Sequence, residues 1–250
     1  MMMNLLTEDQ SDKILEAAND SSIINFDWRN RGEAPRGYTR GMALTYGQVY
    51  LDYTLGSKFA IDMAKADHED DDTDGLTWYQ SRMRPLGWDN KTDGPDTLRH
   101  LFVLLLGLGM RESSGRYCEG RDRSADNVTA DTAEAGLFQM SWNARSATPL
   151  LPELFGFHLA NPWNGFLSVF SSGVSCHNSD LANYGSGPGA EFQHLCKSCP
   201  AFAVKAAAIG LRHMRTHWGP INRHEAQVVP AADVLFKQVQ GIVDGANVMV

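Results

Sequence analysis

Residues 95–115, PDTLRHLFVLLLGLGMRESSG, form the stretch that decides the fold. Pro95 and Asp96 mark a helix start, because proline is favoured where its missing N–H has no bond to lose. The residues that follow, through Met110, are apolar on nearly every side, which predicts a helix at the buried centre of the second half of the chain. The sequence then changes to Arg-Glu-Ser-Ser-Gly, so Glu112 lies at the very end of this helix.

The position of Glu112 has chemical consequences. A carboxylate near the C-terminus of a helix opposes the helix dipole, although the neighbouring Arg111 offers a simple electrostatic explanation for it. Partial burial disfavours the charged carboxylate, so the pKa of Glu112 should rise. A carboxylic acid that keeps its proton near neutral pH can protonate a glycosidic oxygen as the bond breaks. The stretch therefore predicts a general acid at Glu112.

The composition describes an ordinary globular protein, with 250 residues of which 43% are hydrophobic and 21% charged. The formal net charge of −8 argues against a nucleic-acid partner, which normally requires a basic face. The longest apolar run, residues 101–110, is about half of the ~20 residues that a membrane-spanning helix needs, so we expect no membrane span. The N-terminus lacks a basic region followed by a long apolar core, so we expect no secretory signal peptide.

Other segments also favour helices. Thr7 and Gln10 form a capping-box pattern before a helix. Met42, Tyr46 and Tyr53 lie on one stripe of a long helical region that should be interrupted near Gly56-Ser57. Further helices are predicted over residues 163–170 and 201–218 and after Pro230, and the scarcity of alternating β-branched residues predicts little sheet.

An acidic stretch suggests a division of the chain into residues 1–94 and 95–250. Asp70, Asp72, Asp74 and Gly75 fit the first half of a calcium loop. The position of the closing carboxylate is occupied by Ser81, so a solvated acidic loop is the favoured interpretation.

Four cysteines, Cys118, Cys176, Cys196 and Cys199, favour one or two structural disulfides. Buried thiols remain an alternative, and so does a zinc site at the Cys196-x-x-Cys199 pair, although the second half of a zinc signature is missing. The histidines lack metalloprotease spacing, and no nucleophile signature or phosphate-binding loop is present. We therefore expect no metal and no other cofactor.

Three short motifs occur in order: Glu112-Ser113, Gly136-Leu137-Phe138-Gln139, and Tyr184 followed by Gly187-Pro188-Gly189. Together they resemble the signatures of the goose-type lysozyme and lytic transglycosylase family, over residues 95–218. The resemblance implies a mainly α fold, with a lysozyme-like domain over residues 95–250 and an N-terminal helical extension over residues 1–94. Gly185 departs from the family, which usually has asparagine after the tyrosine.

The resemblance also implies roles for individual residues. Glu112 would be the general acid and base, and Gln139 and Tyr184 would line the cleft with Phe138. Ser113 would either support the catalytic residue from behind or orient the substrate. An inverting hydrolase also needs a second carboxylate, and the candidates are Glu119, Asp122, Asp126, Asp131 and Glu134. Asp131 and Glu134 lie closest to the position of the auxiliary aspartate in goose-type enzymes. Without either, a single carboxylate would serve, as in lytic transglycosylases.

The function implied is cleavage of the β-1,4 bond between N-acetylmuramic acid and N-acetylglucosamine in peptidoglycan. Such a protein would act outside the cytoplasm, either secreted or delivered into another cell's periplasm as an antibacterial effector, with an inhibitor or immunity protein as partner. One alternative is a glycosidase for chitin or chitosan, and the acidic composition mildly favours the cationic chitosan. Others are an inactive lysozyme-like module that binds cell walls and a purely structural helical protein.

Overall fold

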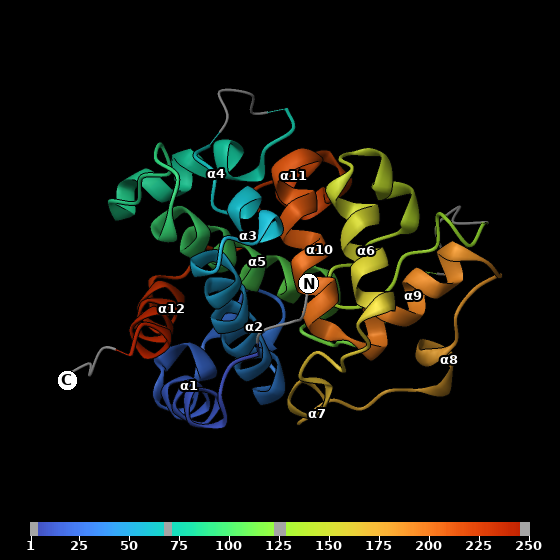
Figure 1. Cartoon of the computed structure of the whole chain (residues 1–250), viewed down its shortest axis with the longest axis horizontal. Helices are drawn as coiled ribbons and strands as arrows, with labels where there is room; N and C mark the ends of the chain where they lie inside the picture. The colour runs from blue at the N-terminus through green and yellow to red at the C-terminus, as the bar shows by residue number, and fades with distance from the viewer. Residues whose placement is uncertain (1–4, 68–71, 123–128, 246–250) are drawn as a thin grey trace.

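The computed structural model describes residues 5–67, 72–122 and 129–245, and over these ranges the chain is mainly α-helical, as predicted (Figure 1). The α-helices are α1 (Glu8–Asp20), α2 (Arg36–Thr54), α3 (Lys58–Met63), α4 (Gly75–Met83), α5 (Pro95–Ser113), α6 (Leu150–Ala160), α7 (Leu167–Phe170), α8 (Asn178–Leu181), α9 (Pro188–Ser198), α10 (Pro200–His213), α11 (Gly219–Asn222) and α12 (Pro230–Val243). Short 3₁₀ helices are η1 (Ser22–Asn25), η2 (Arg84–Leu86), η3 (Trp142–Ser146) and η4 (Arg215–His217). Strands β1 (Asp27–Trp28) and β2 (Gly32–Glu33) form one antiparallel hairpin.

Helix α5 lies at the centre of the molecule and is buried along most of its length. As predicted, it begins at Pro95. Gly109 lets the ring of Tyr38 pack against the helix, since a Cβ at this glycine would lie 2.2 Å from the tyrosine hydroxyl oxygen. That hydroxyl donates a hydrogen bond to the carbonyl of Leu106 at 2.8 Å. The helix ends where Ser114 adopts a left-handed conformation with φ of 53°, a common helix end that leaves Glu112 in the last turn.

The predicted N-terminal helices are present. The capping box of Thr7 and Gln10 begins α1, and the chain breaks between α2 and α3 at residues 55–57. Tyr46 of α2 packs against Phe102 of α5 and Phe236 of α12, with ring centroids 5.0 and 4.8 Å apart. Helices from both sides of residue 94 therefore bury their apolar faces together.

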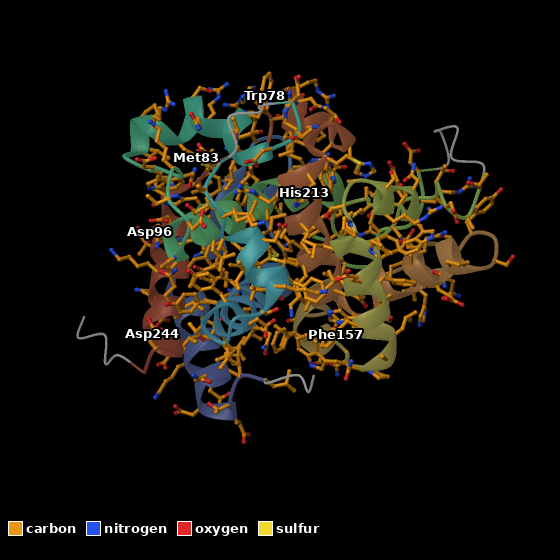
Figure 2. All side chains as sticks on the ribbon, turned by 45° about the horizontal axis from the view of Figure 1, so that its top comes forward. Trp78, Met83, Asp96, Phe157, His213 and Asp244 are labelled. Atoms are coloured by element: carbon orange, nitrogen blue, oxygen red, sulfur yellow. A yellow bond between two sulfur atoms is a disulfide. The ribbon has the colours of Figure 1, made fainter. Side chains whose placement is uncertain are left out.

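The sharing of apolar surface extends over the whole described chain. One hydrophobic core runs from Ile14 of α1 to Val239 of α12, and Figure 2 shows side chains filling the space between these helices. The described helices before residue 94 thus share a core with those that follow it. The division into an N-terminal helical segment over residues 1–94 and a lysozyme-like catalytic domain over residues 95–250 stays a prediction.

Some of the observed helices differ from those predicted. The helix expected over residues 163–170 is reduced to the single turn of α7, because Phe166 just before it has a left-handed backbone with φ of 60°. The helix expected over 201–218 ends at His213, and Gly219-Pro220 begins α11. Helix α6 was not predicted.

The interpretation of the acidic stretch as a solvated loop is wrong for Asp74. Its side chain caps the N-terminus of α4, accepting a hydrogen bond from the backbone N–H of Leu76, and is fully buried. The carboxylate lies 3.1 Å from the guanidinium of Arg212 of α10, which is only 1% exposed. A buried charge needs such a partner, and this partner is distant in sequence. Asp70 lies outside the described residues.

The cysteines divide into two pairs. Cys118 and Cys176 form a disulfide, so the predicted structural disulfide is confirmed for one pair. Cys196 and Cys199 are buried free thiols, and burial raises the pKa of Cys199 to about 11. Within the described ranges no group of three or more histidine, cysteine or acidic side chains is arranged to hold a metal ion, which leaves the zinc alternative without a ligand set.

None of the helices in the described ranges is both long and apolar enough to cross a membrane.

Candidate active site

The first two sequence motifs meet at the end of α5. Ser113, the last residue of the helix, is 4% exposed. Its hydroxyl lies 3.1 Å from the carbonyl of Gly109 in the preceding turn and 2.9 Å from the carbonyl of Leu137 in the second motif. Ser113 therefore joins the helix to the Gly136–Gln139 turn. Because its hydroxyl is buried and lies within hydrogen-bond distance of two backbone carbonyls, the structure favours the supporting role for Ser113 over direct orientation of the substrate.

Glu112 has the electrostatic character that the sequence predicts. Burial raises the pKa of this carboxyl from 4.5 to about 7, and the negative charge of Glu134 adds to the increase. The positive charges of three arginines lower this pKa: Arg31, Arg223 and Arg111. The Glu112 carboxyl can thus carry a proton at neutral pH, as a general acid must.

Of the two acidic residues closest to the second motif, Glu134 is the one whose charge contributes to the raised pKa of Glu112. The charge of Asp131 is not among the main influences on the pKa of Glu112. Its carboxylate forms an ion pair with Arg145 at 3.2 Å, and 43% of the side chain is exposed. Since two nearby carboxylates raise each other's pKa, the influence of Glu134 on Glu112 indicates that the two face one region.

The other acidic candidates have different surroundings. The carboxylate of Glu119 lies 3.3 Å from the guanidinium of Arg116, which also pairs with Asp180. Burial raises the pKa of Glu119, but its charge is not a main influence on Glu112. Asp126 lies outside the described residues, and the charge of Asp122 is not a main influence on the pKa of Glu112.

The second motif forms a tight turn closed by a bridge between Ala135 and Met140. Gln139 has a left-handed backbone with φ of 45°, and its side-chain amide donates to the carbonyl of Gly136 at 3.1 Å. The Phe138 carbonyl accepts a hydrogen bond from the Trp218 indole at 2.8 Å. At 1% exposure the Phe138 ring belongs to the core, so the expectation that it lines the cleft is wrong. The Gln139 side chain serves mainly to hold the turn.

The third motif is held against the loop that precedes Glu134. The side-chain amide of Gln193 in α9 accepts from the backbone N–H of Tyr184 at 2.8 Å, and donates to the carbonyls of Tyr184 and Ala130 at 3.1 and 3.0 Å. Tyr184 itself is 38% exposed, and the Arg121 guanidinium lies 4.0 Å from its ring centroid. The Arg121 guanidinium thus covers one face of the partly exposed ring, and a contact of Tyr184 with a substrate stays a prediction.

The absence of a side chain at Gly185 has a steric reason. This residue has φ of 74°, and an added Cβ would lie 2.8 Å from the Cβ of Ala130. A side chain here would disturb the contact between the two loops. The sequence contains no signal for the Gln193 clamp, because an amide inside a helix is ordinarily a surface residue.

The sequence places Arg111 beside Glu112, but sequence reasoning missed two other arginines near this carboxyl, Arg31 and Arg223. Arg111 and Arg223 both bind the carboxylate of Glu225, at 3.0 and 2.8 Å. Arg31, from the β1–β2 hairpin, donates to the carbonyl of Arg111 and to the hydroxyl of Ser114. In the described part of the chain Arg31 has no ion pair with a carboxylate. The N-terminal segment thus contributes a cation whose charge is not neutralised by a partner.

Comparison with known proteins identifies no relative. No known family, curated protein or solved structure matches the chain. A functional conclusion must therefore come from the residues of this site.

Proposed function

We propose that this protein is a muramidase that cleaves the β-1,4 bond between N-acetylmuramic acid and N-acetylglucosamine in peptidoglycan. One observation carries the proposal: the carboxyl of Glu112, at the end of a buried helix, has a pKa raised to about 7. In this mechanism Glu112 protonates the leaving oxygen as positive charge develops at the anomeric carbon. The order of the three motifs and the connection between the first two at Ser113 support the same assignment.

Glu134 is the second carboxylate of the proposed mechanism. Its charge acts on Glu112, whereas Asp131 is bound to Arg145. In a hydrolase Glu134 would activate the attacking water, and the products would carry reducing ends. In a lytic transglycosylase the sugar's own hydroxyl would attack instead and leave 1,6-anhydro ends. Mass spectrometry of the released fragments distinguishes these two forms of the reaction.

The local charge favours peptidoglycan over chitosan. Although the whole chain is acidic, Arg31 places an unneutralised cation beside the last turn of α5. The muramic acid units of peptidoglycan carry carboxylates, which a guanidinium binds well, whereas chitosan carries ammonium groups that it repels. We therefore assign the preference to an anionic glycan and set aside the weaker argument from net charge.

The direct test is digestion of purified peptidoglycan by the wild-type protein and by Glu112→Gln. We expect soluble muropeptides from the wild type and at least a 100-fold lower rate from the variant, because removal of a general acid typically costs about 10²–10⁴-fold. Circular dichroism and the thermal midpoint serve as the control for folding. An inactive wall-binding module would release no fragments with either protein and would bind walls equally well after the substitution.

We further propose that the protein works outside the cytoplasm and, as an effector, in the periplasm of a target cell. The Cys118–Cys176 disulfide is compatible with an oxidising compartment. Expression in a bacterium with and without a periplasmic leader tests this. Lysis should follow only periplasmic expression and should be abolished by Glu112→Gln. Lysis from the cytoplasmic form, or from the variant, would contradict the proposal.

A further inference from the structure

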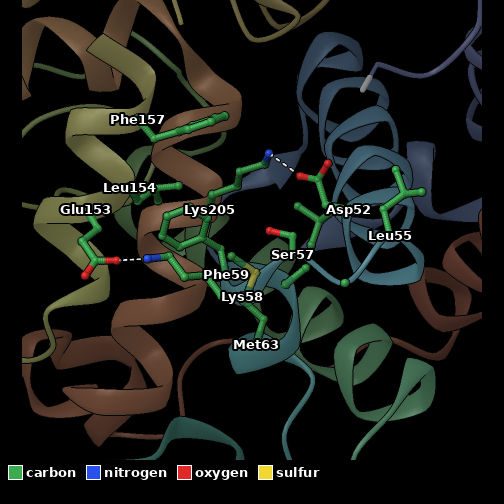
Figure 3. Close-up of a pocket in the computed structure, with 13 residues that line it drawn as sticks. Asp52, Leu55, Ser57, Lys58, Phe59, Met63, Glu153, Leu154, Phe157 and Lys205 are labelled. Atoms are coloured by element: carbon green, nitrogen blue, oxygen red, sulfur yellow. Dashed lines mark hydrogen bonds and ion pairs between the residues drawn. The ribbon is translucent and has the colours of Figure 1, made fainter. Parts of the chain in front are cut away.

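A cavity that shares no residue with the Glu112 site lies between α2, α3, α6 and α10 (Figure 3). Its volume is about 590 Å³, within the range of ~300–1,000 Å³ that is usual for small-molecule sites. Helices α2 and α3 precede residue 94, while α6 and α10 follow it. The cavity therefore lies where the N-terminal helices meet the rest of the molecule.

The lining is mainly apolar. Ala60 and Met63 of α3 and Leu154 of α6 are almost fully buried around the cavity. The aromatic side chains of Phe59 and Phe157 also line it, and their ring centroids are 6.3 Å apart. Such walls favour a ligand that is itself largely apolar.

The charged groups of the lining neutralise one another. Lys205 of α10 reaches Asp52 of α2 with 2.8 Å between ammonium and carboxylate, and Lys58 pairs with Glu153 (Figure 3). The formal charge of these four groups is zero. A charged ligand would therefore bring an uncompensated charge into apolar surroundings, which is strongly unfavourable.

Two polar groups of the lining retain capacity for hydrogen bonds. Lys205 is 5% exposed, and within the described residues its only hydrogen-bond acceptor is Asp52, although an ammonium has three N–H donors. Ser57, also buried, precedes α3 without capping it, and its hydroxyl has no partner in the described part of the chain. Both can bind one oxygen atom of a ligand.

We propose that this cavity binds an uncharged, mainly apolar molecule that carries one hydrogen-bonding oxygen, of the kind represented by a medium-chain alcohol. The apolar walls would take the hydrocarbon part, and Ser57 and Lys205 would bind the oxygen. This inference is independent of the proposed muramidase activity, because it uses none of the residues around Glu112.

Three probes of equal chain length test the ligand class: 1-octanol, octanoate and octylammonium, added to the whole protein at pH 7. Methyl resonances of Met63 and Leu154, followed by NMR, report occupation of the cavity. We expect saturable shifts with octanol and at least tenfold weaker binding of both charged probes. The absence of saturable shifts with octanol, or equally tight binding of a charged probe, would overturn the proposal.

Two variants locate the site. Ala60→Phe fills the cavity and should abolish octanol binding, whereas Val234→Phe on the exposed surface of α12 should leave it unchanged. Ser57→Ala removes only one oxygen, so it keeps the test possible if Ala60→Phe does not fold. We expect it to weaken octanol binding several-fold, as loss of one hydrogen bond does. Wild-type affinity in Ser57→Ala, or in folded Ala60→Phe, would contradict the assigned binding mode.

Discussion

The carboxyl group of Glu112 is subject to opposing influences. Burial and the charge of Glu134 raise its pKa, while Arg31, Arg223 and Arg111 lower it. The charge effects act through space, so each can be altered without changing Glu112 itself. The proposed chemistry can therefore be tested one charge at a time.

The pH dependence of activity should follow this balance. For the wild type we expect kcat/KM to fall as pH rises through about 7, where Glu112 loses its proton. Glu134→Gln removes a negative charge, so the alkaline limb of its residual activity should move to lower pH. Arg31→Gln removes a positive charge, so its alkaline limb should move to higher pH. Measurement of kcat/KM from pH 4 to 9 checks both directions.

Asp131→Asn is the matched control for these two variants. Asp131 lies only three residues from Glu134, but its charge is not a main influence on Glu112. The fall of kcat/KM at alkaline pH should therefore occur at the same pH in Asp131→Asn as in the wild type. If Asp131→Asn moved the limb as far as Glu134→Gln, the assignment of Glu134 as the coupled carboxylate would be wrong.

The raised pKa of Glu112 should also reduce stability at neutral pH. Between pH 4.5 and 7 the folded state binds a proton that the unfolded state has lost, so the free energy of unfolding falls as pH rises through this window. Glu112→Gln cannot titrate. Its stability relative to the wild type should therefore increase from pH 4 to pH 8, by at most about 3 kcal/mol. Urea unfolding at the two pH values measures the change, and a difference independent of pH would contradict it.

At the scale of the elements, a hydrogen bond connects the end of α5 to the Gly136–Gln139 turn, so each holds the other in position. Ser113 provides the connection through the carbonyl of Leu137. We expect Ser113→Ala to lower the free energy of unfolding by about 1–2 kcal/mol, because a buried carbonyl loses its partner. It should also lower kcat more than it raises KM, since Glu112 becomes less well positioned.

Ser171→Ala offers a comparison for this prediction. Its exposed hydroxyl also donates to a backbone carbonyl, that of Ser168, at 2.9 Å. Unfolding and kinetics of this variant should stay close to those of the wild type. Equal effects of the two substitutions would show that Ser113 has no special connecting role.

The elements differ in how well the sequence predicts them, for physical reasons. Helix α5 and the start of α1 were predicted because their signals are local: a proline, a capping box and apolar spacing. Helix α6 was missed because Pro149, Pro152 and Gly156 suggest a loop, although a proline in the first turn is tolerated. The end of α10 at His213 depends on packing that no local pattern specifies.

On the scale of the whole molecule, the Cys118–Cys176 disulfide joins the loop after α5 to the segment before α8 across a sequence separation of 58. Closing a loop of this length stabilises the folded state by about 4 kcal/mol in the chain-entropy description. We expect reduction, or Cys118→Ser with Cys176→Ser, to lower the thermal midpoint markedly. Reductant should have no further effect on the double variant. An unchanged midpoint in the reduced wild type would contradict this.

The site too could be predicted only in part. Glu112 was identified because its burial follows from its own helix. The choice of Glu134 over Asp131 depends on Arg145, and the presence of Arg31 depends on how the hairpin packs against α5. Contacts between distant segments carry no local signal in a single sequence.

The protonation of Glu112 can be measured directly by ¹³C NMR titration of the glutamate side-chain carboxyl groups in the wild type and in Glu112→Gln. We predict that the resonance missing from the variant titrates in the wild type with a midpoint near pH 7. A midpoint below pH 5 for that resonance would mean that the carboxyl is ionised at neutral pH, and Glu112 could not be the acid of the proposed reaction.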